Sequence, residues 1–391
     1  MKYEFNTIID RHNTNSIKTD LAVRRGKPED VLPLWVADMD FTTSPEILEA
    51  LHKKVNHGIF GYSLADDAFY KAVKNWQKSE HNFDINRHYI VTTPGVVFAV
   101  ATAIKAFTKK NDSIIIFTPI YYPLRDTIIN NERKVITSSL IESNGKYKMD
   151  YEDFEKKIID NKVKLFILCS PHNPVGRVWT KEELLKLSEI CLRHNVLVFS
   201  DEIHNDFIYE PNRHTVYSTL SEEVAQNCIV STSASKTFNL AGLQFSINFI
   251  QNPNLKQKFK NEIAKTGYDE PSLMGLVATQ AAYEKGKPWL IQLKKYLLEN
   301  LNFLKDFLKK KLKKLRLIEP EGTFLVWLDF SAYGLLDDEL DNIIVNKAKL
   351  WLDRATMFGI EGDNFQRINI ATPRKILQEA LEKLEKIFGE L

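Results

Sequence analysis

Lys236 is the only formally charged residue between positions 224 and 255. At the chain's charged fraction of 27%, a stretch of this length would carry about nine charges. The apolar, β-branched residues 228–230 predict a buried strand, and the small hydroxyl residues after them predict a loop that leaves it. Burial would lower the pKa of the Lys236 amine and make it a usable nucleophile or base. Ser233 and Ser235 beside it could bind a phosphate, whereas the structural alternative is a lysine that snorkels from a buried edge.

Further polar and aromatic residues follow other predicted strands. Open parallel sheets bind ligands beyond the carboxyl ends of their strands, so these residues are candidates for one shared site. They are Gly95 at a helix start, Tyr121 and Tyr122, Asn173 between two prolines, Asp201 and Glu202, and His204. Each group has a structural alternative: a turn glycine, core tyrosines, a turn asparagine, helix-capping carboxylates and a surface histidine.

Together these residues would supply a lysine, a carboxylate, an amide, an aromatic ring and a phosphate cradle. The free backbone amides at the helix start after Gly95 would bind a phosphate. A tyrosine could stack on a flat ring. The set suits a phosphorylated pyridine aldehyde, which the lysine binds as a Schiff base while the carboxylate keeps the ring nitrogen protonated.

The elements that must position these residues alternate between apolar strands and helices from about residue 90 onward. Strands that are apolar throughout, with helices between them, are typical of a mostly parallel sheet covered on both faces, so we predict an α/β fold. The predicted strands are 90–93, 113–117, 134–140, 164–169, 196–199, 229–231 and 245–250. The predicted helices are 45–55 with Ser44 as N-cap, 67–79, 95–107, 151–159, and 180–194 with a capping box of Thr180 and Glu183.

The pattern changes after about residue 285. A long helix over 288–312 precedes short paired strands at 315–318 and 323–328, a helix near Asp337–Leu350, a strand at 367–371 and a last helix from Arg374. This order predicts a smaller α+β domain. We therefore expect a large domain at 46–287 and a small domain that combines 1–45 with 288–391.

The composition argues against several classes of partner. Lys and Arg number 53 against 51 Asp and Glu, so the balance of charge favours neither nucleic acid nor an anionic membrane. Three widely spaced cysteines without a CxxC predict reduced thiols, and we expect no bound metal. The N-terminus lacks the pattern of a signal peptide, and no apolar run approaches the ~18 residues that a membrane span needs. We expect a cytoplasmic protein that acts on a small molecule.

The chain resembles the fold-type I pyridoxal-phosphate enzymes of the aminotransferase class I/II superfamily. It is most similar to the MalY/PatB group of cystathionine β-lyases, also called cysteine-S-conjugate β-lyases, and the likeness covers nearly the whole chain. The motifs that carry it are LPLWVADMDF at 32–41, FGY at 60–62, TPGVV at 93–97, TPIYYP at 118–123, SPHNPVGRVWT at 170–180, SDEIH at 200–204, SKTFNLAG at 235–242, PEGTFLVWLD at 320–329 and RINIATPR at 367–374.

The resemblance implies a role for each candidate residue. Lys236 would hold pyridoxal 5′-phosphate covalently and move the substrate Cα proton, Asp201 would pair with the pyridine nitrogen, and Tyr121 would stack on the ring. The other residues implied in cofactor binding are Tyr62, Gly95, Val96, Val97, Asn173, Ile203, His204, Ser233 and Ser235. Those implied in substrate binding are Trp35, Ala37, Asp38, Asn173 and Arg367, the last as a bidentate clamp on the α-carboxylate. Tyr62 would reach the cofactor of the neighbouring subunit, so the resemblance implies a homodimer.

One position departs from the wider superfamily. Many aminotransferases carry a phosphate-binding arginine eight positions after the lysine, and this chain has Gln244 there. We therefore expect phosphate binding to depend on hydroxyls and backbone amides, with weaker retention of the cofactor. Arg374 could be a second anion contact, but a surface residue at a helix start is the favoured interpretation.

The resemblance implies a carbon–sulfur β-lyase that eliminates a thiol from cystathionine or a related cysteine S-conjugate and yields pyruvate and ammonia. An aminotransferase on the same scaffold is the nearest alternative. A regulatory protein with vestigial lyase activity is an alternative of another class, although no motif in this chain supports it.

Overall fold

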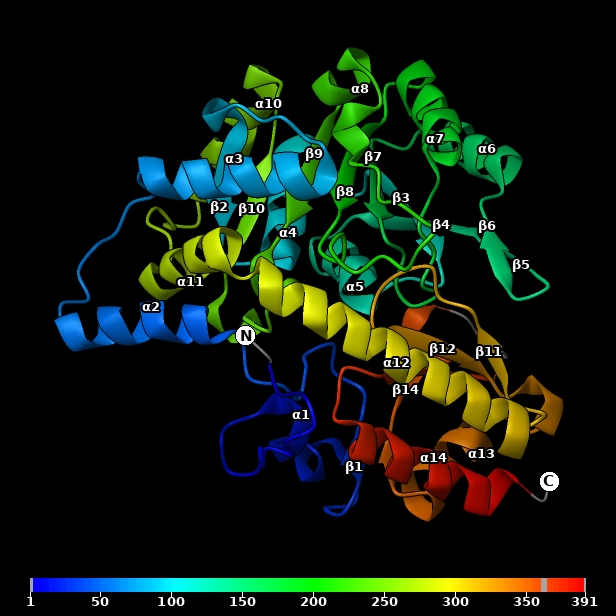
Figure 1. Cartoon of the computed structure of the whole chain (residues 1–391). Coiled ribbons are helices and arrows are strands. Elements are labelled where there is room, and N and C mark those ends of the chain that lie inside the picture. The colour runs from blue at the N-terminus through cyan, green and yellow to red at the C-terminus, as the bar shows by residue number, and fades with distance from the viewer. Residues whose placement is uncertain (1–2, 360–363, 390–391) are drawn as a thin grey trace.

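The computed structural model describes residues 3–359 and 364–389. Its largest element is a seven-stranded sheet in the order β2-β10-β9-β8-β7-β3-β4 (Figure 1). Neighbouring strands from β9 to β4 are parallel, and β10 is antiparallel to β2 and to β9. The strands are β2 (Ile90–Thr93), β3 (Ser113–Thr118), β4 (Lys134–Ser139), β7 (Leu165–Cys169), β8 (Leu197–Asp201), β9 (Cys228–Thr232) and β10 (Ser246–Phe249). The predicted mostly parallel α/β fold is confirmed.

Both faces of this sheet are buried, which explains why its central strands are apolar throughout. Along β3, Ile114 and Ile116 belong to one hydrophobic cluster, which includes α4 and α5, while Ile115 and Phe117 belong to another, which includes α6 and α7. Successive side chains of a strand point to opposite faces, so each residue needs an apolar partner layer. The helices of this part are α3 (Asp67–His81), α4 (Val96–Phe107), α5 (Tyr122–Asn130), α6 (Tyr151–Asn161), α7 (Lys181–Arg193), α8 (Glu222–Gln226), α9 (Ala234–Thr237), α10 (Pro253–Ala264) and α11 (Leu273–Lys285).

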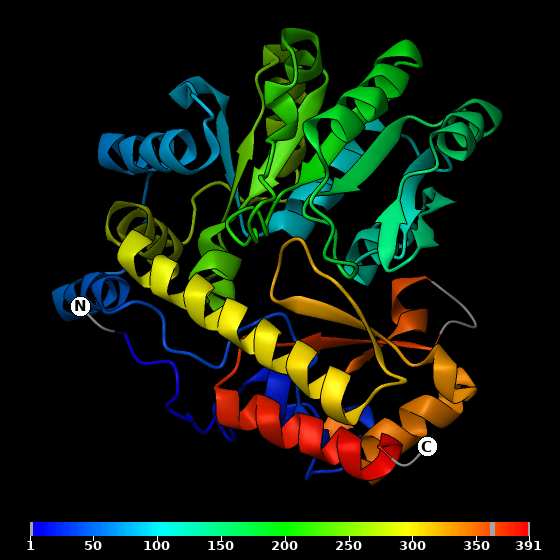
Figure 2. The same ribbon diagram turned by 45° about the vertical axis from the view of Figure 1, so that its right-hand side comes forward.

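A second, antiparallel sheet forms the lower part of the molecule in the order β11-β12-β15-β14 (Figure 2). Its strands are β11 (Arg316–Ile318), β12 (Leu325–Asp329), β14 (Asp353–Arg354) and β15 (Phe365–Asn369), and the long helix α12 (Lys287–Lys311) and α14 (Arg374–Phe388) lie beside it. The strand β1 (Leu32–Pro33) pairs in parallel with β13 (Leu350–Trp351). The N-terminal segment therefore lies against the C-terminal part of the chain, while the predicted division at residues 46 and 288 stays a prediction.

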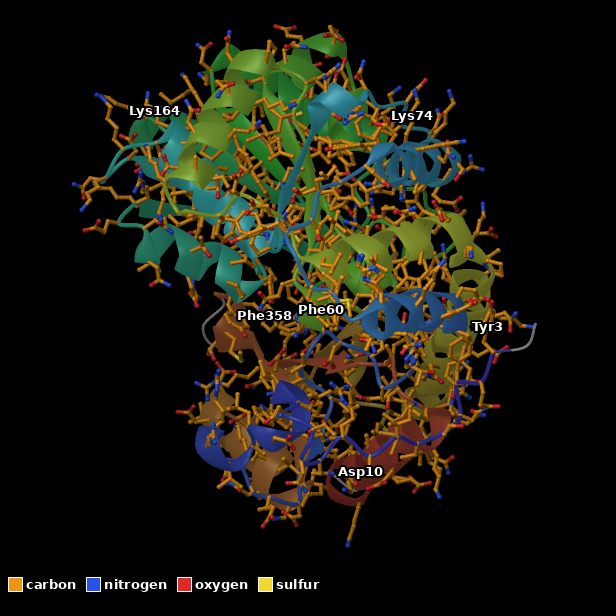
Figure 3. The ribbon with its side chains drawn as sticks, turned by 90° about the vertical axis from the view of Figure 1, so that its left-hand side faces the viewer. Tyr3, Asp10, Phe60, Lys74, Lys164 and Phe358 are labelled. Atoms are coloured by element: carbon orange, nitrogen blue, oxygen red, sulfur yellow. The ribbon has the colours of Figure 1, made fainter. Side chains whose placement is uncertain are left out.

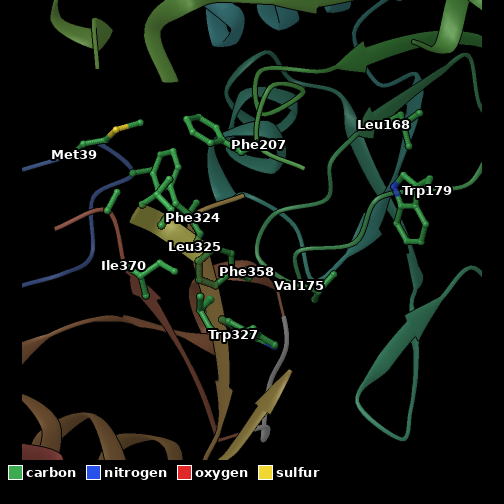
Figure 4. Packing of buried hydrophobic residues seen from close by; sticks show 14 of the residues in the cluster. Met39, Leu168, Val175, Trp179, Phe207, Phe324, Leu325, Trp327, Phe358 and Ile370 are labelled. Atoms are coloured by element: carbon green, nitrogen blue, oxygen red, sulfur yellow. The ribbon is translucent and has the colours of Figure 1, made fainter. Parts of the chain in front are cut away.

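Aromatic packing joins the second sheet to the loops of the first. Phe324, which precedes β12, packs edge-on against Phe207 with ring centroids 5.0 Å apart (Figure 4). Trp327 of β12 stacks on Phe365 at 5.2 Å and lies edge-on to Phe358. These contacts place β15, which carries Arg367, below the carboxyl ends of the central strands.

Several sequence predictions were incomplete. The helix predicted near Asp337–Leu350 is wrong at its C-terminal end: α13 covers Asp337–Asn342, a π-helical turn follows at Ile343–Lys347, and Leu350 is extended because it pairs with β1. Helices α5, α10 and α11 and the hairpin β5 (Ile141–Ser143) and β6 (Lys146–Lys148) were not predicted. Helix α11 was not predicted because it is buried on several faces and its sequence has no amphipathic period. Helix α10 carries a visible start signal, Asn252 as N-cap before Pro253.

We expect Gly176→Ala to destabilise the protein by about 2–4 kcal/mol, since it combines left-handed strain with overpacking. Gly176 has φ +71°, and a Cβ there would lie 2.8 Å from Cβ of Pro320. Gly145 has φ +80° with open space around it. Gly145→Ala should therefore lose only the stability that the left-handed backbone conformation costs an alanine. Urea unfolding of both variants measures the difference, and equal losses of stability would contradict the close contact.

Candidate functional site

A cavity of about 410 Å³ lies at the carboxyl ends of the central strands. Its size is in the range of small-molecule sites. It brings together eleven residues that the sequence singled out: Ala37, Gly95, Val96, Val97, Tyr121, Asn173, Asp201, Ile203, His204, Ser235 and Lys236. They come from six separate segments of the chain, so the topology of the parallel sheet assembles them.

Lys236 lies on α9, a single helical turn that follows β9. Its Nζ donates a hydrogen bond to the backbone oxygen of Ala37 at 2.9 Å, inside the cavity. Burial lowers the pKa of Lys236 to about 8, with Arg367 acting in the same direction and Asp38 and Asp201 opposing it. A substantial fraction of the amine is therefore neutral near pH 8, as a nucleophile or base requires. This placement argues against the alternative of a snorkelling lysine.

Asp201 is the last residue of β8 and is 4% exposed. Its Oδ1 accepts a hydrogen bond from the backbone N–H of Ile203 at 3.1 Å. Burial nevertheless raises the pKa of Asp201 to about 7, and Glu202 acts in the same direction, while that hydrogen bond and Lys236 lower it. A buried carboxyl with a raised pKa is stabilised in its charged form when a cation, such as a protonated ring nitrogen, binds beside it.

Three more residues, Tyr121, Asn173 and His204, line the cavity from neighbouring loops. The backbone N–H of Tyr121 donates to the oxygen of Asn173 at 3.1 Å, which fixes the two loops together. His204 is buried, and burial lowers its pKa to about 3, so the imidazole is neutral. It packs edge-on to Phe324 at 5.8 Å and is therefore a cavity wall residue, not the surface histidine of the alternative interpretation.

The start of α4 forms the anion-binding end of the cavity. Gly95 is the N-cap of this twelve-residue helix, and Gly95, Val96 and Val97 all line the cavity with Ser235 and Gln244. The first backbone N–H groups of a helix have no intrahelical acceptors, and its dipole favours negative charge there. This end can hold a phosphate. Gln244, which stands at the position of the arginine discussed above, also lines it.

Ser233 requires a correction. Its hydroxyl donates to the backbone oxygen of Phe245 at 2.6 Å and accepts from the N–H of Ser235 at 3.0 Å. Ser233 thus caps α9 and does not line the cavity, so its contribution is to hold the turn that carries Lys236.

Arg367 lies below the cavity on β15 and is 2% exposed. Its Nη1 donates to Oδ1 of Asn173 at 3.0 Å, and its Nη2 donates to the backbone oxygen of Trp35 at 2.8 Å. It also pairs with Asp353, a buried carboxylate on the neighbouring strand that the sequence did not single out. Its Nε has no hydrogen-bond partner among the described residues, so this N–H of the guanidinium is still available.

The arm residues near the cavity have different surroundings. Ala37 lines the cavity, whereas Trp35 stacks on Trp351 with ring centroids 4.2 Å apart. Asp38 is turned to Arg11, with Oδ2 2.6 Å from Nη2. Neither Trp35 nor Asp38 lines the cavity. Their side chains contact Trp351 and Arg11 instead, whereas the sequence predicted that they would contact the substrate.

Two other predicted residues lie away from the cavity. Tyr62 is 95% exposed, in an extended segment that also exposes Ile59, Phe60 and Leu64 (Figure 3, which labels Phe60). Arg374 begins α14, where its Nε donates to Oδ1 of Asn300 and its guanidinium lies over Phe303. Arg374 is thus a helix-start residue, as the favoured interpretation had it.

Some lining residues were missed by sequence reasoning: Pro94, Phe98, Cys169, Ala241 and Phe245. Pro94 and Ala241 lie inside the motifs that contain Gly95 and Lys236, so their closeness in sequence to these residues could have identified them as lining residues. Cys169 ends β7 beside Asp201 in the parallel register, which only the strand order reveals.

These residues fit a phosphorylated pyridine aldehyde. The helix start at α4 would hold the phosphate, Lys236 would bind the aldehyde carbon, and Asp201 would meet the ring nitrogen, with Tyr121 and Ile203 lining the cavity as candidate ring contacts. The helix start favours a negative phosphate, the amine can react with the aldehyde, and the carboxylate can pair with the ring nitrogen.

Comparison with known proteins is consistent with this geometry. Residues 29–384 match the family model of aminotransferase class I and II. The chain is 40% identical to cystathionine beta-lyase PatB of Bacillus subtilis (strain 168) over 376 residues, which covers 96% of this chain and 97% of that protein. Cystalysin of Treponema denticola, whose crystal structure contains pyridoxal 5′-phosphate, superposes with a TM-score of 0.95 at 38% identity and covers 99% of this chain and 98% of its own. A pyridoxal-phosphate-bound protein of Clostridium difficile 630, which carries an aminotransferase name, superposes with a TM-score of 0.96 at 42% identity, over 98% of this chain and 99% of its own.

Proposed function

The chain belongs to the aminotransferase class I and II family, and from this membership we propose that it is a pyridoxal 5′-phosphate (PLP)-dependent carbon–sulfur β-lyase. It cleaves cystathionine or a related cysteine S-conjugate, with one water, to a thiol, pyruvate and ammonia. The observation that carries the proposal is the presence of a partly buried amine with a lowered pKa, Lys236, and a buried carboxyl, Asp201, in one cavity of a chain 40% identical to a cystathionine β-lyase.

In this proposal the cofactor is PLP, which Lys236 would hold covalently, and the helix start at Gly95–Val97 and Ser235 would hold its phosphate. When bound, PLP supplies a covalent attachment for the substrate amine and an electron sink for the Cα carbanion. Asp201 would keep the ring nitrogen protonated, and Tyr121 and Ile203 would pack on the ring. Asn173 contributes its amide beside the ring, in a position that its bond with Arg367 fixes.

The residues of this chain perform the remaining steps. Arg367 binds the α-carboxylate of the substrate, because its buried guanidinium has a donor without a partner in the described structure. Lys236, once neutral, removes the Cα proton and can return a proton to the departing group. The leaving thiolate would take the electron pair of the Cβ–S bond and a proton, and one water would convert the remaining three-carbon fragment to pyruvate and ammonia. A wall of Ala37, Val96 and Phe98 limits water around the reacting atoms.

Pyruvate release from cystathionine in the absence of any 2-oxo acid tests this proposal against an aminotransferase. The C. difficile protein with the aminotransferase name is the observation that favours the rival. A lyase turns over repeatedly without a 2-oxo acid, because elimination consumes no amino acceptor. A single turnover that resumes only on addition of a 2-oxo acid would establish the rival instead.

The active unit in this proposal is a homodimer in which Tyr62 of one subunit reaches the cofactor phosphate of the other. Ile59, Phe60, Tyr62 and Leu64 form a contiguous exposed apolar segment, and such segments mark interaction sites. Division into domains at 46–287 and at 1–45 with 288–391, and a cytoplasmic location, are further parts of the proposal. No helix in the described part of the chain is long and apolar enough to cross a membrane.

Mixing two inactive variants tests whether Tyr62 acts across the dimer. Lys236→Ala and Tyr62→Ala each lack one component of a site. If Tyr62 acts on the partner's site, each mixed dimer contains one complete site, and subunit exchange should restore about a quarter of wild-type activity. If Tyr62 acts within its own subunit, mixing restores none, and size-exclusion chromatography confirms that exchange took place.

A further inference from the structure

A buried contact between a histidine and a carboxylate, which the proposed mechanism does not use, lies next to the turn that carries the lysine. His81, the last residue of α3, lies 3.0 Å through Nε2 from Oδ1 of Asp206, and both side chains are 4% exposed. The other carboxylate oxygen, Oδ2, accepts a hydrogen bond of 2.5 Å from the hydroxyl of Thr237, which is fully buried. Thr237 directly follows Lys236, so the pair reaches the backbone that carries the reactive amine.

Asp206 is charged in this setting. Burial alone would raise its pKa, but the hydrogen bond and charge of His81 and the bond from Thr237 lower the pKa below the ordinary value. The arrangement does not activate Thr237 as a nucleophile, because its hydroxyl donates to the carboxylate instead of to a base and does not reach the cavity.

The same carboxylate belongs to the segment that carries the other reactive group. Residues 201–206 include Asp201 and the cavity residues Ile203 and His204, so the bond from Thr237 to Asp206 joins the acid-bearing segment to the lysine-bearing turn. Two neighbouring contacts join the same segments: the N–H of Glu202 donates to the oxygen of Ser231 at 2.8 Å, and the hydroxyl of Thr232 donates to the oxygen of Glu202 at 3.3 Å.

We propose that His81, Asp206 and Thr237 are positioning residues that fix the placement of Lys236 relative to Asp201. This inference rests on the proposed function, since it assumes that both residues act on one bound PLP. A hydrogen bond to a charged carboxylate is shorter and stronger than a neutral one. A displacement of about 1 Å at a reacting group can cost about 10²-fold in rate. These three residues, called the brace below, act through the backbone and touch neither cofactor nor substrate.

The experiment compares Thr237→Val, which removes the hydroxyl at similar volume, with Thr237→Ser, which keeps it. Asp206→Asn removes the buried carboxylate that both His81 and Thr237 contact and can prevent folding, so the threonine variants are the primary test. The matched control is Thr127→Val, which removes another buried hydroxyl bond, 2.5 Å to the oxygen of Pro123, in α5. For each protein we would measure the melting temperature, the dissociation constant for added PLP, the absorbance spectrum of the bound cofactor, and kcat and KM separately.

We expect Thr237→Val to lower kcat about 10- to 100-fold with KM little changed, to weaken PLP binding and to alter the cofactor spectrum. Thr237→Ser should restore all of these values to within about threefold of wild type, since it restores the bond to Asp206. The inference is overturned if Thr237→Val and Thr127→Val lower the melting temperature alike and both leave kcat, PLP affinity and spectrum unchanged. Borohydride reduction of the wild type separates the two proposals: no pyridoxyl label on Lys236 refutes the proposed function, whereas a labelled wild type with unaltered variants refutes only the brace.

Discussion

Replacing Lys236 with alanine should lower kcat for pyruvate formation by about 10⁴-fold, the upper end of what a positioned acid–base group supplies. The variant loses the amine that holds PLP and the base that moves the Cα proton. The cavity wall at Ala37 remains, but its backbone oxygen loses the donor that now bonds to it at 2.9 Å. Single-turnover and steady-state assays of the PLP-saturated variant measure the loss.

Lys236→Arg is the control for charge and length, because it keeps a cation but no usable amine. We expect it to be as inactive as Lys236→Ala. A small primary amine added to the alanine variant should restore part of the proton transfer, since it can occupy the space that the side chain vacates. Retention of more than a tenth of the activity in both variants would show that another group moves the proton.

The lowered pKa of Lys236 has a consequence for stability that can be measured separately. In PLP-free protein the folded state has a pKa of about 8 for this group, whereas the unfolded chain has the ordinary value of 10.5. Between these values the unfolded state binds more protons, so stability rises with pH across this window, by roughly 3 kcal/mol in total. Below about pH 8 the penalty is constant. Lys236→Met should lack this rise, and urea titrations at several pH values compare the two proteins.

The sequence predicted the site more completely than the surroundings that hold it. Lys236, Asp201 and Asn173 were identifiable because each follows an apolar strand, and the parallel sheet brings strand ends to one edge. The ion pair of Arg367 with Asp353 was not identifiable, because it depends on the antiparallel register of β14 and β15. Local pattern predicts which residues end a strand, whereas pairing register is a property of the folded chain.

Ser233 and Asp38 show a second limit of reading motifs. Both lie inside segments with neighbours that line the cavity, yet Ser233 bonds to the oxygen of Phe245 and Asp38 pairs with Arg11. A side chain near a site can either face the ligand or hold the wall, and the choice depends on competing partners from distant segments. The same reason explains why the contacts among His81, Asp206 and Thr237 could not be predicted: successive members are 125 and 31 positions apart in sequence.

Asp201→Asn should lower kcat about 10²–10³-fold, which corresponds to the 3–4 kcal/mol lost when one member of a buried charge pair is removed. Asparagine has nearly the same shape and can still accept from the N–H of Ile203, so the loop should keep its conformation. It cannot hold the ring nitrogen in its protonated form, and the electron sink is weakened. Asp201→Glu tests geometry instead, because it keeps the charge and moves the carboxylate outward.

The raised pKa of Asp201 provides an independent check on the same residue. In the folded, PLP-free protein the pKa of Asp201 is about 7, whereas in the unfolded chain it has the ordinary value of 3.8. Between these pH values the folded state therefore binds more protons than the unfolded state. Its contribution to stability is therefore fully present below about pH 4 and is lost as pH rises to about 7, with a span of about 4 kcal/mol. Asp201→Asn removes this dependence, so the difference in stability between variant and wild type should grow in favour of the variant from pH 4 to pH 7. Bound PLP should abolish the dependence in the wild type, since a ring cation keeps the carboxylate charged throughout; an unchanged pH profile on adding PLP would show that Asp201 does not meet the ring nitrogen.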